Sequence, residues 1–158
     1  MTRSALTVLF LLAACGKSST ADVPVYTDAL AGQVKAVAPN CVPVPANSTA
    51  KIRETLDCSG QAGQIGVRLT DGRKLWSMTI SLVGKSAAEV KPTLRAVLTG
   101  FVSPKAIETI EAHLDDPAKD LMDDGTRISV DGVEVMAVSR KVADLTRYET
   151  HLSWAFRR

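Results

Sequence analysis

Short runs of alternating apolar and polar side chains predict a β-hairpin in the first half of the chain. Every second residue is apolar in residues 65–69 and again in residues 76–82, and the turn pair Asp71-Gly72 lies between the two runs. A two-residue turn fixes the register of a hairpin, and here it would bring the apolar residues of both strands to one face. The predicted cross-strand pairs are Val67 with Trp76 and Ile65 with Met78.

The same kind of pattern predicts a second hairpin and a last strand near the C-terminus. Branched aliphatic residues at alternate positions of 128–130 and 133–135 flank an Asp-Gly pair at 131–132. Pairing across that turn places the four aliphatic side chains on one side of the sheet. Residues 148–156 also alternate, and residues 52–58 do so more loosely.

Three segments have apolar residues at helical spacing instead. We expect a first helix over residues 24–38, ended by Pro39. A second helix begins with the capping-box sequence of residues 86–89 and ends near Gly100, and Pro92 predicts a kink or a late start. A third helix starts at 103–104, where a serine precedes a proline.

These elements predict an α+β fold. Residues 40–50 contain two prolines and are expected to form an extended surface loop. The predicted order is therefore helix, three strands, two helices, three strands, or α-βββ-αα-βββ. An antiparallel sheet of about five to six strands, with the helices packed on one face, would bury the apolar sides of both. Residues 23–158 would form this single domain.

The N-terminus has the pattern of an export signal. Arg3 supplies a positive charge, residues 5–14 are apolar apart from Thr7, and two alanines close the run. The run is much shorter than the roughly 20 apolar residues that a membrane-spanning helix needs. A removable signal peptide over residues 1–14 is the better interpretation.

The sequence Leu12-Ala13-Ala14-Cys15-Gly16 resembles the lipobox of bacterial lipoproteins. In that family the signal is cut just before the cysteine, which receives a diacylglycerol and usually an N-linked acyl chain such as palmitate. The resemblance covers residues 1 to about 20 and implies that Cys15 is the lipidation site. Residues 15–22 would then form the lipidated cysteine and a flexible tether.

The same resemblance implies a location. The protein would be held at the cell envelope, at the outer membrane facing the periplasm in a Gram-negative organism and otherwise at the outer face of the plasma membrane. Gly16 rather than an aspartate after the cysteine agrees with export to the outer membrane. Two or more acyl chains hold a protein stably at a bilayer, whereas one binds only marginally.

With Cys15 assigned to lipid, Cys41 and Cys58 remain to pair with each other. Exported chains fold in an oxidising compartment where disulfide bonds persist. The alternatives are a metal pair or a redox pair, and neither is favoured by a CxxC spacing or by nearby histidines. A disulfide would join the end of the first helix to the sheet.

Composition and charge narrow the choice of partners. The chain has 19 basic and 17 acidic residues, and only 4% of its residues are aromatic. A nearly neutral chain with few aromatic side chains is a poor candidate for binding nucleic acid. The expected partners are the lipid bilayer and an unknown envelope protein.

Candidate catalytic chemistry is sparse. No nucleophile-elbow, zinc-protease or phosphate-loop motif occurs, and the spacing of a calcium-binding EF-hand is absent. The only histidines, His113 and His151, are each expected to be solvent-exposed, with His151 on the polar side of the last strand. We therefore expect a non-enzymatic protein without a metal or cofactor.

Three functions follow in order of preference. The first is an envelope lipoprotein that acts through protein–protein contact at the membrane surface. The second is small-molecule or lipid binding in a pocket between sheet and helices. The weaker alternatives are a hydrolase and a protein like the bacterial secretion chaperones, whose helix–three-strand–helix–strand order is similar. The residues that could line the pocket are Trp76, Met78, Trp154 and Phe156.

Overall fold

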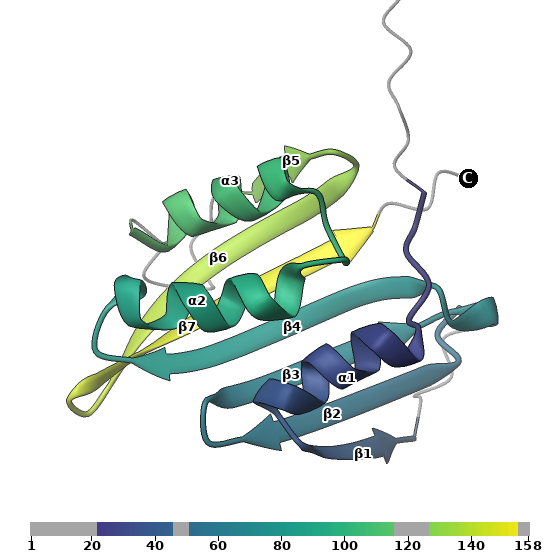
Figure 1. Ribbon diagram of the computed structural model, residues 1–158, viewed down its shortest axis with the longest axis horizontal. Helices are drawn as coiled ribbons and strands as arrows, with labels where there is room; N and C mark the ends of the chain where they lie inside the picture. The colour runs from purple at the N-terminus through teal and green to yellow at the C-terminus, as the bar shows by residue number, and fades with distance from the viewer. Residues whose placement is uncertain (1–21, 46–50, 116–126, 155–158) are drawn as a thin grey trace, which may run out of the picture.

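A computed structural model describes residues 22–45, 51–115 and 127–154, which form a seven-stranded antiparallel sheet and three helices (Figure 1). The strand order across the sheet is β1-β2-β3-β4-β7-β6-β5. The fold is thus mixed α+β, with one strand more than the five to six predicted. The strands are β1 (Asn40–Val44), β2 (Glu54–Gly60), β3 (Gly63–Leu69), β4 (Leu75–Gly84), β5 (Arg127–Val130), β6 (Val133–Val142) and β7 (Leu145–Trp154). The helices are α1 (Asp28–Val37), α2 (Ala87–Leu98) and α3 (Pro104–Asp115).

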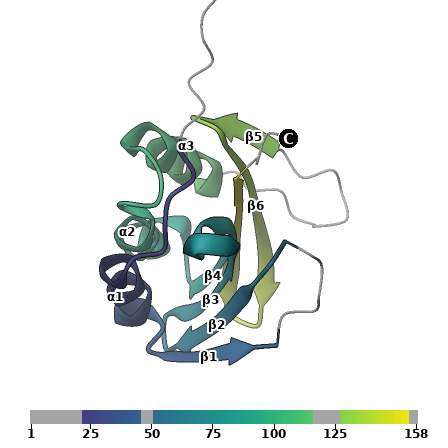
Figure 2. The ribbon, with the colours of Figure 1, turned by 90° about the vertical axis from the view of Figure 1, so that its right-hand side faces the viewer.

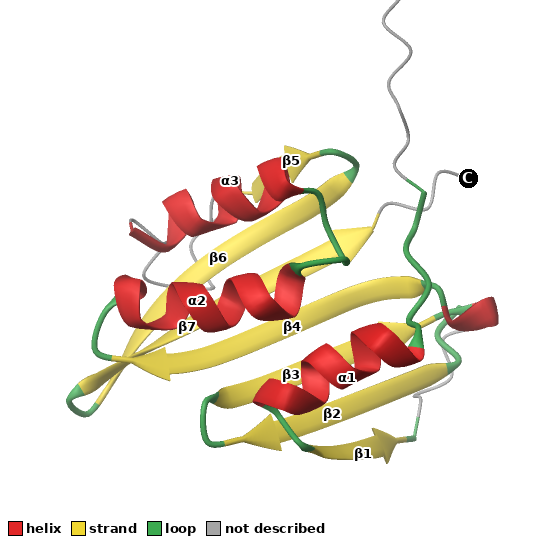
Figure 3. Ribbon diagram, viewed as in Figure 1, coloured by secondary structure: helices red, strands yellow, loops and turns green. Residues whose placement is uncertain are grey.

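All three helices lie on one face of the sheet, as the patterns predicted, and the other face has no helix over it (Figures 2 and 3). Helix α1 packs against β2, α2 against β4, and α3 against β5 and β6. Each helix has one buried stripe, which faces the apolar side of the sheet. The hydrophobic core is this single layer between helices and sheet, with Ile65, Val67, Met78, Ile80 and Leu152 at most 1% exposed.

The helix ends follow the sequence signals in part. Helix α2 begins at Ala87 and continues through Pro92, so it does not start late. The Ser86 side chain makes no cap hydrogen bond, while the Glu89 carboxylate accepts one from the Lys85 backbone N–H at 2.7 Å. Gly100 lies just beyond the helix with φ of 87°, a conformation that glycine adopts at least cost.

The first predicted hairpin forms, but its predicted register is wrong. Residues Asp71–Arg73 make a short 3-10 turn rather than a two-residue loop, and Val67 pairs with Met78 instead of Trp76. A register shift at the start of β4 leaves Trp76 as an extra residue between Leu75 and Ser77. Beyond this irregularity the two-residue shift keeps Met78, Ile80 and Leu82 on their predicted face, so the apolar side of the sheet is still continuous.

The second predicted hairpin forms with the predicted register. Val130 pairs with Val133 and Ile128 pairs with Val135 across a two-residue turn. Asp131 and Gly132 have φ values of 48° and 80°, as a tight turn of this hand requires. Ser103, which caps α3, donates a hydrogen bond to the Asp131 carboxylate at 2.5 Å and so fixes the turn beneath that helix.

The segment predicted to be a surface loop is in part a strand. Asn40–Val44 pairs with β2 as the edge strand β1, in spite of Pro43. Proline is tolerated on an edge strand because a backbone N–H there need not enter the sheet. The predicted order α-βββ-αα-βββ is therefore corrected to α-ββββ-αα-βββ.

Cys41 and Cys58 lie at disulfide distance, as predicted, with their sulfur atoms 2.11 Å apart. They are directly opposite each other on β1 and β2. The bond thus joins the edge strand to its neighbour rather than the helix to the sheet. Because Ala38 and Pro39 alone separate α1 from β1, the bond also restrains the end of the helix.

The chain enters the domain at one end of the strands. The backbone N–H of Leu75, the first residue of β4, donates to the carbonyl of Pro24 at 3.0 Å, and Val25 forms a bridge with Lys74. The tight turn between β6 and β7, at Ala143 and Asp144, lies at the other end of the strands. The two features are therefore separated by the full length of β4.

Candidate functional site

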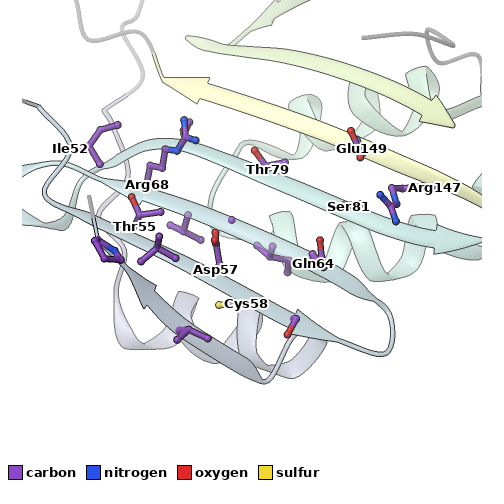
Figure 4. A pocket seen from close by; sticks show the side chains of 18 residues that line it. Ile52, Thr55, Asp57, Cys58, Gln64, Arg68, Thr79, Ser81, Arg147 and Glu149 are labelled. Carbon is purple, nitrogen blue, oxygen red and sulfur yellow. The ribbon is translucent and has the colours of Figure 1, made fainter. Parts of the chain in front are cut away.

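The helix-free face of the sheet contains a hollow of about 760 Å³ (Figure 4). Its residues come from five neighbouring strands, β1, β2, β3, β4 and β7. Apart from Cys58, whose side chain is buried on the helix side, the side chains labelled in Figure 4 belong to the side of the sheet opposite the helices. Those labels are Ile52, Thr55, Asp57, Cys58, Gln64, Arg68, Thr79, Ser81, Arg147 and Glu149.

The face is hollow because its central residues are small. Strand β4 contributes Ser77, Thr79 and Ser81 at alternate positions, and β3 contributes Gly66 opposite Thr79. Larger side chains on β2, β3 and β7 surround this floor. Successive side chains of a strand point to opposite faces of the sheet. The residues between those of the hollow therefore point into the core.

One side of the hollow is apolar. Val42, Val44 and Pro45 line it from β1 and just beyond, and Ile52 lines it from the segment before β2. Val42 is 60% exposed and Val44 38% exposed, which is unusual for valine on a folded domain. The disulfide at Cys41 holds this exposed apolar strand against the sheet.

The rest of the rim carries charges of both signs. Arg68 and Arg147 are the cations, and Asp57 and Glu149 are the acids. No ion pair within 4.0 Å joins any of these four to another of them in the described part of the chain. The hollow therefore offers separate positive and negative contacts beside an apolar wall.

His151 lies beside this hollow, between a hydroxyl and a carboxylate. Its Nδ1 atom is 3.2 Å from the Thr79 hydroxyl and its Nε2 atom is 3.9 Å from the Glu149 carboxylate. Nε2 is buried and makes no hydrogen bond. Burial lowers the pKa of His151, Glu149 opposes this by raising it, and Arg68 lowers it further. His151 is thus partly exposed, with a side chain 33% exposed, rather than fully exposed as expected, and it lies on the polar side of β7 as predicted.

A hydroxyl, an imidazole and a carboxylate in this order suggest nucleophilic catalysis, but the surroundings do not support it. A catalytic hydroxyl needs nearby N–H donors for the developing oxyanion. Thr79 lies in the middle of β4 between β3 and β7, where the backbone groups of all three strands pair with each other. The 3.9 Å gap to Glu149 is also too long for a hydrogen bond that would orient the ring. The group is better suited to binding than to acyl transfer.

His113 has a local structural role. It lies on α3, partly buried rather than exposed as expected, with Nδ1 3.1 Å from the Thr109 carbonyl one turn earlier. No group of three or more His, Cys, Asp or Glu side chains that could hold a metal occurs within residues 22–45, 51–115 and 127–154.

Of the residues proposed from sequence to line a pocket, Trp76, Met78 and Trp154 do not line this hollow. Met78 and Trp154 are 1% and 4% exposed and pack in the core under the helices. Trp76 is partly exposed at the start of β4, with the Lys51 ammonium 5.8 Å from the centre of its ring. Phe156 and Cys15 lie outside the described residues.

Sequence reasoning missed the hollow although its floor was visible as alternating serine and threonine. Those residues were interpreted only as the polar side of a strand. Their grouping depends on the strand order, which places β7 beside β4 across 60 intervening residues.

Comparison with known proteins adds no assignment, because the chain matches no protein-family model, no curated protein and no solved structure. Within the described residues, no helix is both long enough and apolar enough to cross a bilayer.

Proposed function

We propose that the protein is a lipid-anchored lipoprotein of the bacterial cell envelope that acts without catalysis, by contacting another protein at the membrane surface. The observation that carries the proposal is the sequence Leu12-Ala13-Ala14-Cys15 after a short apolar run. The anchor would be the acylated Cys15, at the outer membrane facing the periplasm or at the outer face of the plasma membrane.

Two features of the domain support this proposal. The Cys41–Cys58 bond fits a chain that folds outside the cytoplasm. The sheet also has a face without helices, which carries exposed valines and, among the described residues, four charged side chains that form no ion pairs with each other. Such a face is available for contact with a partner.

The anchor is tested with Cys15→Ser in the full chain, expressed in a Gram-negative host. We expect the wild-type protein in the membrane fraction, with an N-terminal peptide that carries acyl chains by mass spectrometry. The variant should lose both properties. Ser18→Ala, a small change three residues away, is the matched control and should leave both unchanged. An unmodified Cys15 in the membrane-associated wild type would contradict the anchor.

Contact with another protein is tested by cross-linking in intact cells. A photo-reactive amino acid is placed at Val42 on the exposed wall of the hollow. In a second protein it is placed at Gly32 on α1, where a Cβ would have no neighbouring atom within 4 Å. We expect one recurrent cross-linked partner from the protein labelled at Val42 or from proteins labelled at other sites on the helix-free side. A chain that gives no product from any exposed position would contradict the proposal.

A second candidate function, binding of a lipid or small molecule, is favoured by the hollow itself. A volume of about 760 Å³ is within the range of ligand sites, and the apolar wall beside charged groups suits an amphipathic ligand. Its place would be on the helix-free face, rather than between sheet and helices.

This candidate is tested with a fluorescent fatty acid as the probe. Gly66→Val fills the floor of the hollow, because a Cβ there has only ordinary contacts with Asp57 and Thr79, at 3.5 and 3.9 Å. We expect saturable binding to the wild type and its loss in this variant, with unchanged far-UV circular dichroism. Gly32→Ala on α1 is the control. Equal binding by Gly66→Val and the wild type would contradict a site in the hollow.

A further inference from the structure

The β6–β7 hairpin ends in a surface that combines exposed aliphatic side chains with several cations. Val142 and Leu145 pair across the tight turn and are 43% and 38% exposed. Arg140, Lys141 and Arg147 flank them and are exposed. These five residues are called the hairpin tip below.

Within residues 22–45, 51–115 and 127–154, the cations of the hairpin tip have no acidic partner. Arg140 and Arg147 are directly opposite each other on β6 and β7. Like charges in such a cross-strand pair repel each other and destabilise the sheet. None of the ion pairs in the described part of the chain includes Arg140, Lys141 or Arg147, and the nearby Asp144 is not within 4.0 Å of any of them.

Arginines at the opposite end of the sheet are arranged differently. Arg53 pairs with Asp71 at 2.8 Å, and Arg73 pairs with Glu54 at 3.5 Å. Arg73 also lies over the Tyr26 ring, 5.2 Å from its centre. These two arginines thus have acidic partners, whereas in the described part of the chain the cations of the hairpin tip have no carboxylate within 4.0 Å.

The hairpin tip also lies at the opposite end of β4 from the place where the chain enters the domain. Pro24 lies beside the first residue of β4, and the hairpin tip lies beyond its last, where Gly84 is paired with Thr146. Ten residues of strand β4 span about 33 Å. Nine residues from Cys15 to Pro24 reach at most about 32 Å, so the domain could stand on the hairpin tip with Cys15 in the bilayer only if this tether were fully extended.

We propose that the hairpin tip docks onto a protein segment that carries carboxylates together with aliphatic side chains. This inference rests on the proposed function and names the surface through which the contact occurs. The unpaired cations supply charge complementarity, and Val142 and Leu145 supply apolar contact between them. The orientation favours a protein partner over the bilayer in which the chain is anchored.

The test uses the full chain, purified in a neutral detergent, and three fluorescent 12-residue peptides. The first alternates glutamate with leucine, the second lysine with leucine, and the third glutamate with serine. Binding is measured by anisotropy at low and high salt. We expect the glutamate–leucine peptide to bind most tightly, with an affinity that weakens as salt rises. The lysine peptide should not bind, and the serine peptide should bind more weakly.

Matched variants locate the contact. Arg140→Gln, Lys141→Gln and Arg147→Gln together should weaken binding of the glutamate–leucine peptide by about tenfold, as expected for three exposed ion contacts. The control variant also removes three positive charges, by lysine-to-glutamine changes at three exposed positions outside the hairpin tip. It should weaken binding less than about twofold, because long-range attraction alone is screened by salt. The three control positions are Lys35, Lys74 and Lys105.

Three outcomes overturn the inference. One is an equal loss in the two triple variants, and another is equal binding of the leucine and serine peptides. The third is selective binding of phosphatidylglycerol nanodiscs, but not of the peptide, that the first triple variant abolishes, which would identify a membrane contact instead. Peptide binding does not require an acyl chain. The fractionation experiment can therefore contradict the anchor at Cys15 without affecting the peptide result, and the peptide experiment can contradict the docking surface without affecting the anchor.

Discussion

Ile80 and Ser81 are neighbours on β4, yet Ile80 is completely buried under the helices and Ser81 lines the hollow on the other face. The same alternation extends through β3 and β7, so each strand contributes to two surfaces of different character. One surface is closely covered by three amphipathic helices. The other consists of small hydroxyl-bearing residues, a few charges and an exposed apolar edge. The buried core thus lies on one face of the sheet, and the accessible polar and apolar groups of the hollow lie on the opposite face.

The largest expected effect comes from truncating the covered face. Ile80→Ala should lower the free energy of unfolding by about 2–5 kcal/mol, because it removes buried contacts and leaves a cavity. Ser81→Ala should change it by less than about 0.5 kcal/mol, because the side chain lies on the uncovered face. Urea titration followed by circular dichroism measures both. Similar losses for the two variants would show that the uncovered face is covered in solution, for example by a second copy of the chain.

The disulfide bond lies on the covered face but holds the edge strand that lines the hollow, and its loss should have the next largest effect. Cys58 is buried on the helix side, whereas β1 presents Val42 and Val44 to the hollow. Removing the bond with Cys41→Ala and Cys58→Ala should lower the free energy of unfolding by about 3 kcal/mol, as expected for a loop of this length.

The effect on β1 can be observed directly. Amide hydrogen exchange should accelerate in β1 more than in β4, because β1 has a neighbour on one side only. Reduction of the wild type provides the control, and it should reproduce the variant. Unchanged exchange in β1 would mean that strand pairing alone holds the apolar wall of the hollow.

Much of the covered face could be predicted from sequence, and the reasons are local. Apolar spacing locates the helices, and the Asp131-Gly132 turn sets its own register, since two residues suffice to close it. The Asp71-Gly72 turn extends to Arg73, which also has a positive φ, and the longer turn shifts the register by two residues. Such a shift leaves no trace in the alternation, and so the sequence does not reveal it.

For the uncovered face, the sequence predicts which residues are polar but not how they are grouped across the strands. Strand β1 has no alternation and contains Pro43, so its strand conformation depends on the pairing with β2 and on Cys41. The hollow depends on β7 lying beside β4. This strand order is a property of the whole topology, and the local sequence preferences of the two strands do not determine it. His151 was assigned to the right strand face, but its contact with Thr79 follows from that topology.

The smallest expected effect is a pH dependence of the free energy of unfolding that arises from His151, on the uncovered face. Burial lowers the pKa of this histidine in the folded protein below its ordinary value, with an opposing effect of Glu149 and a further decrease from Arg68. As the pH falls through about 6.5, the unfolded chain takes up the proton first, and the folded state is destabilised relative to it. The free energy of unfolding should therefore fall with decreasing pH until the folded ring is also protonated.

Variants of the two neighbouring groups test the cause of this pH dependence. His151→Gln should remove the His151 contribution between about pH 7 and pH 5, because glutamine does not titrate there. Glu149→Gln should enlarge it, because the carboxylate raises the pKa of His151 and its removal lowers that pKa further. Urea titrations at several pH values measure both slopes. If the free energy of unfolding changes with pH equally in the wild type and in His151→Gln, then His151 has the same pKa in the folded chain as in the unfolded one. The uncovered face would then be wetter around His151 than its buried Nε2 atom implies.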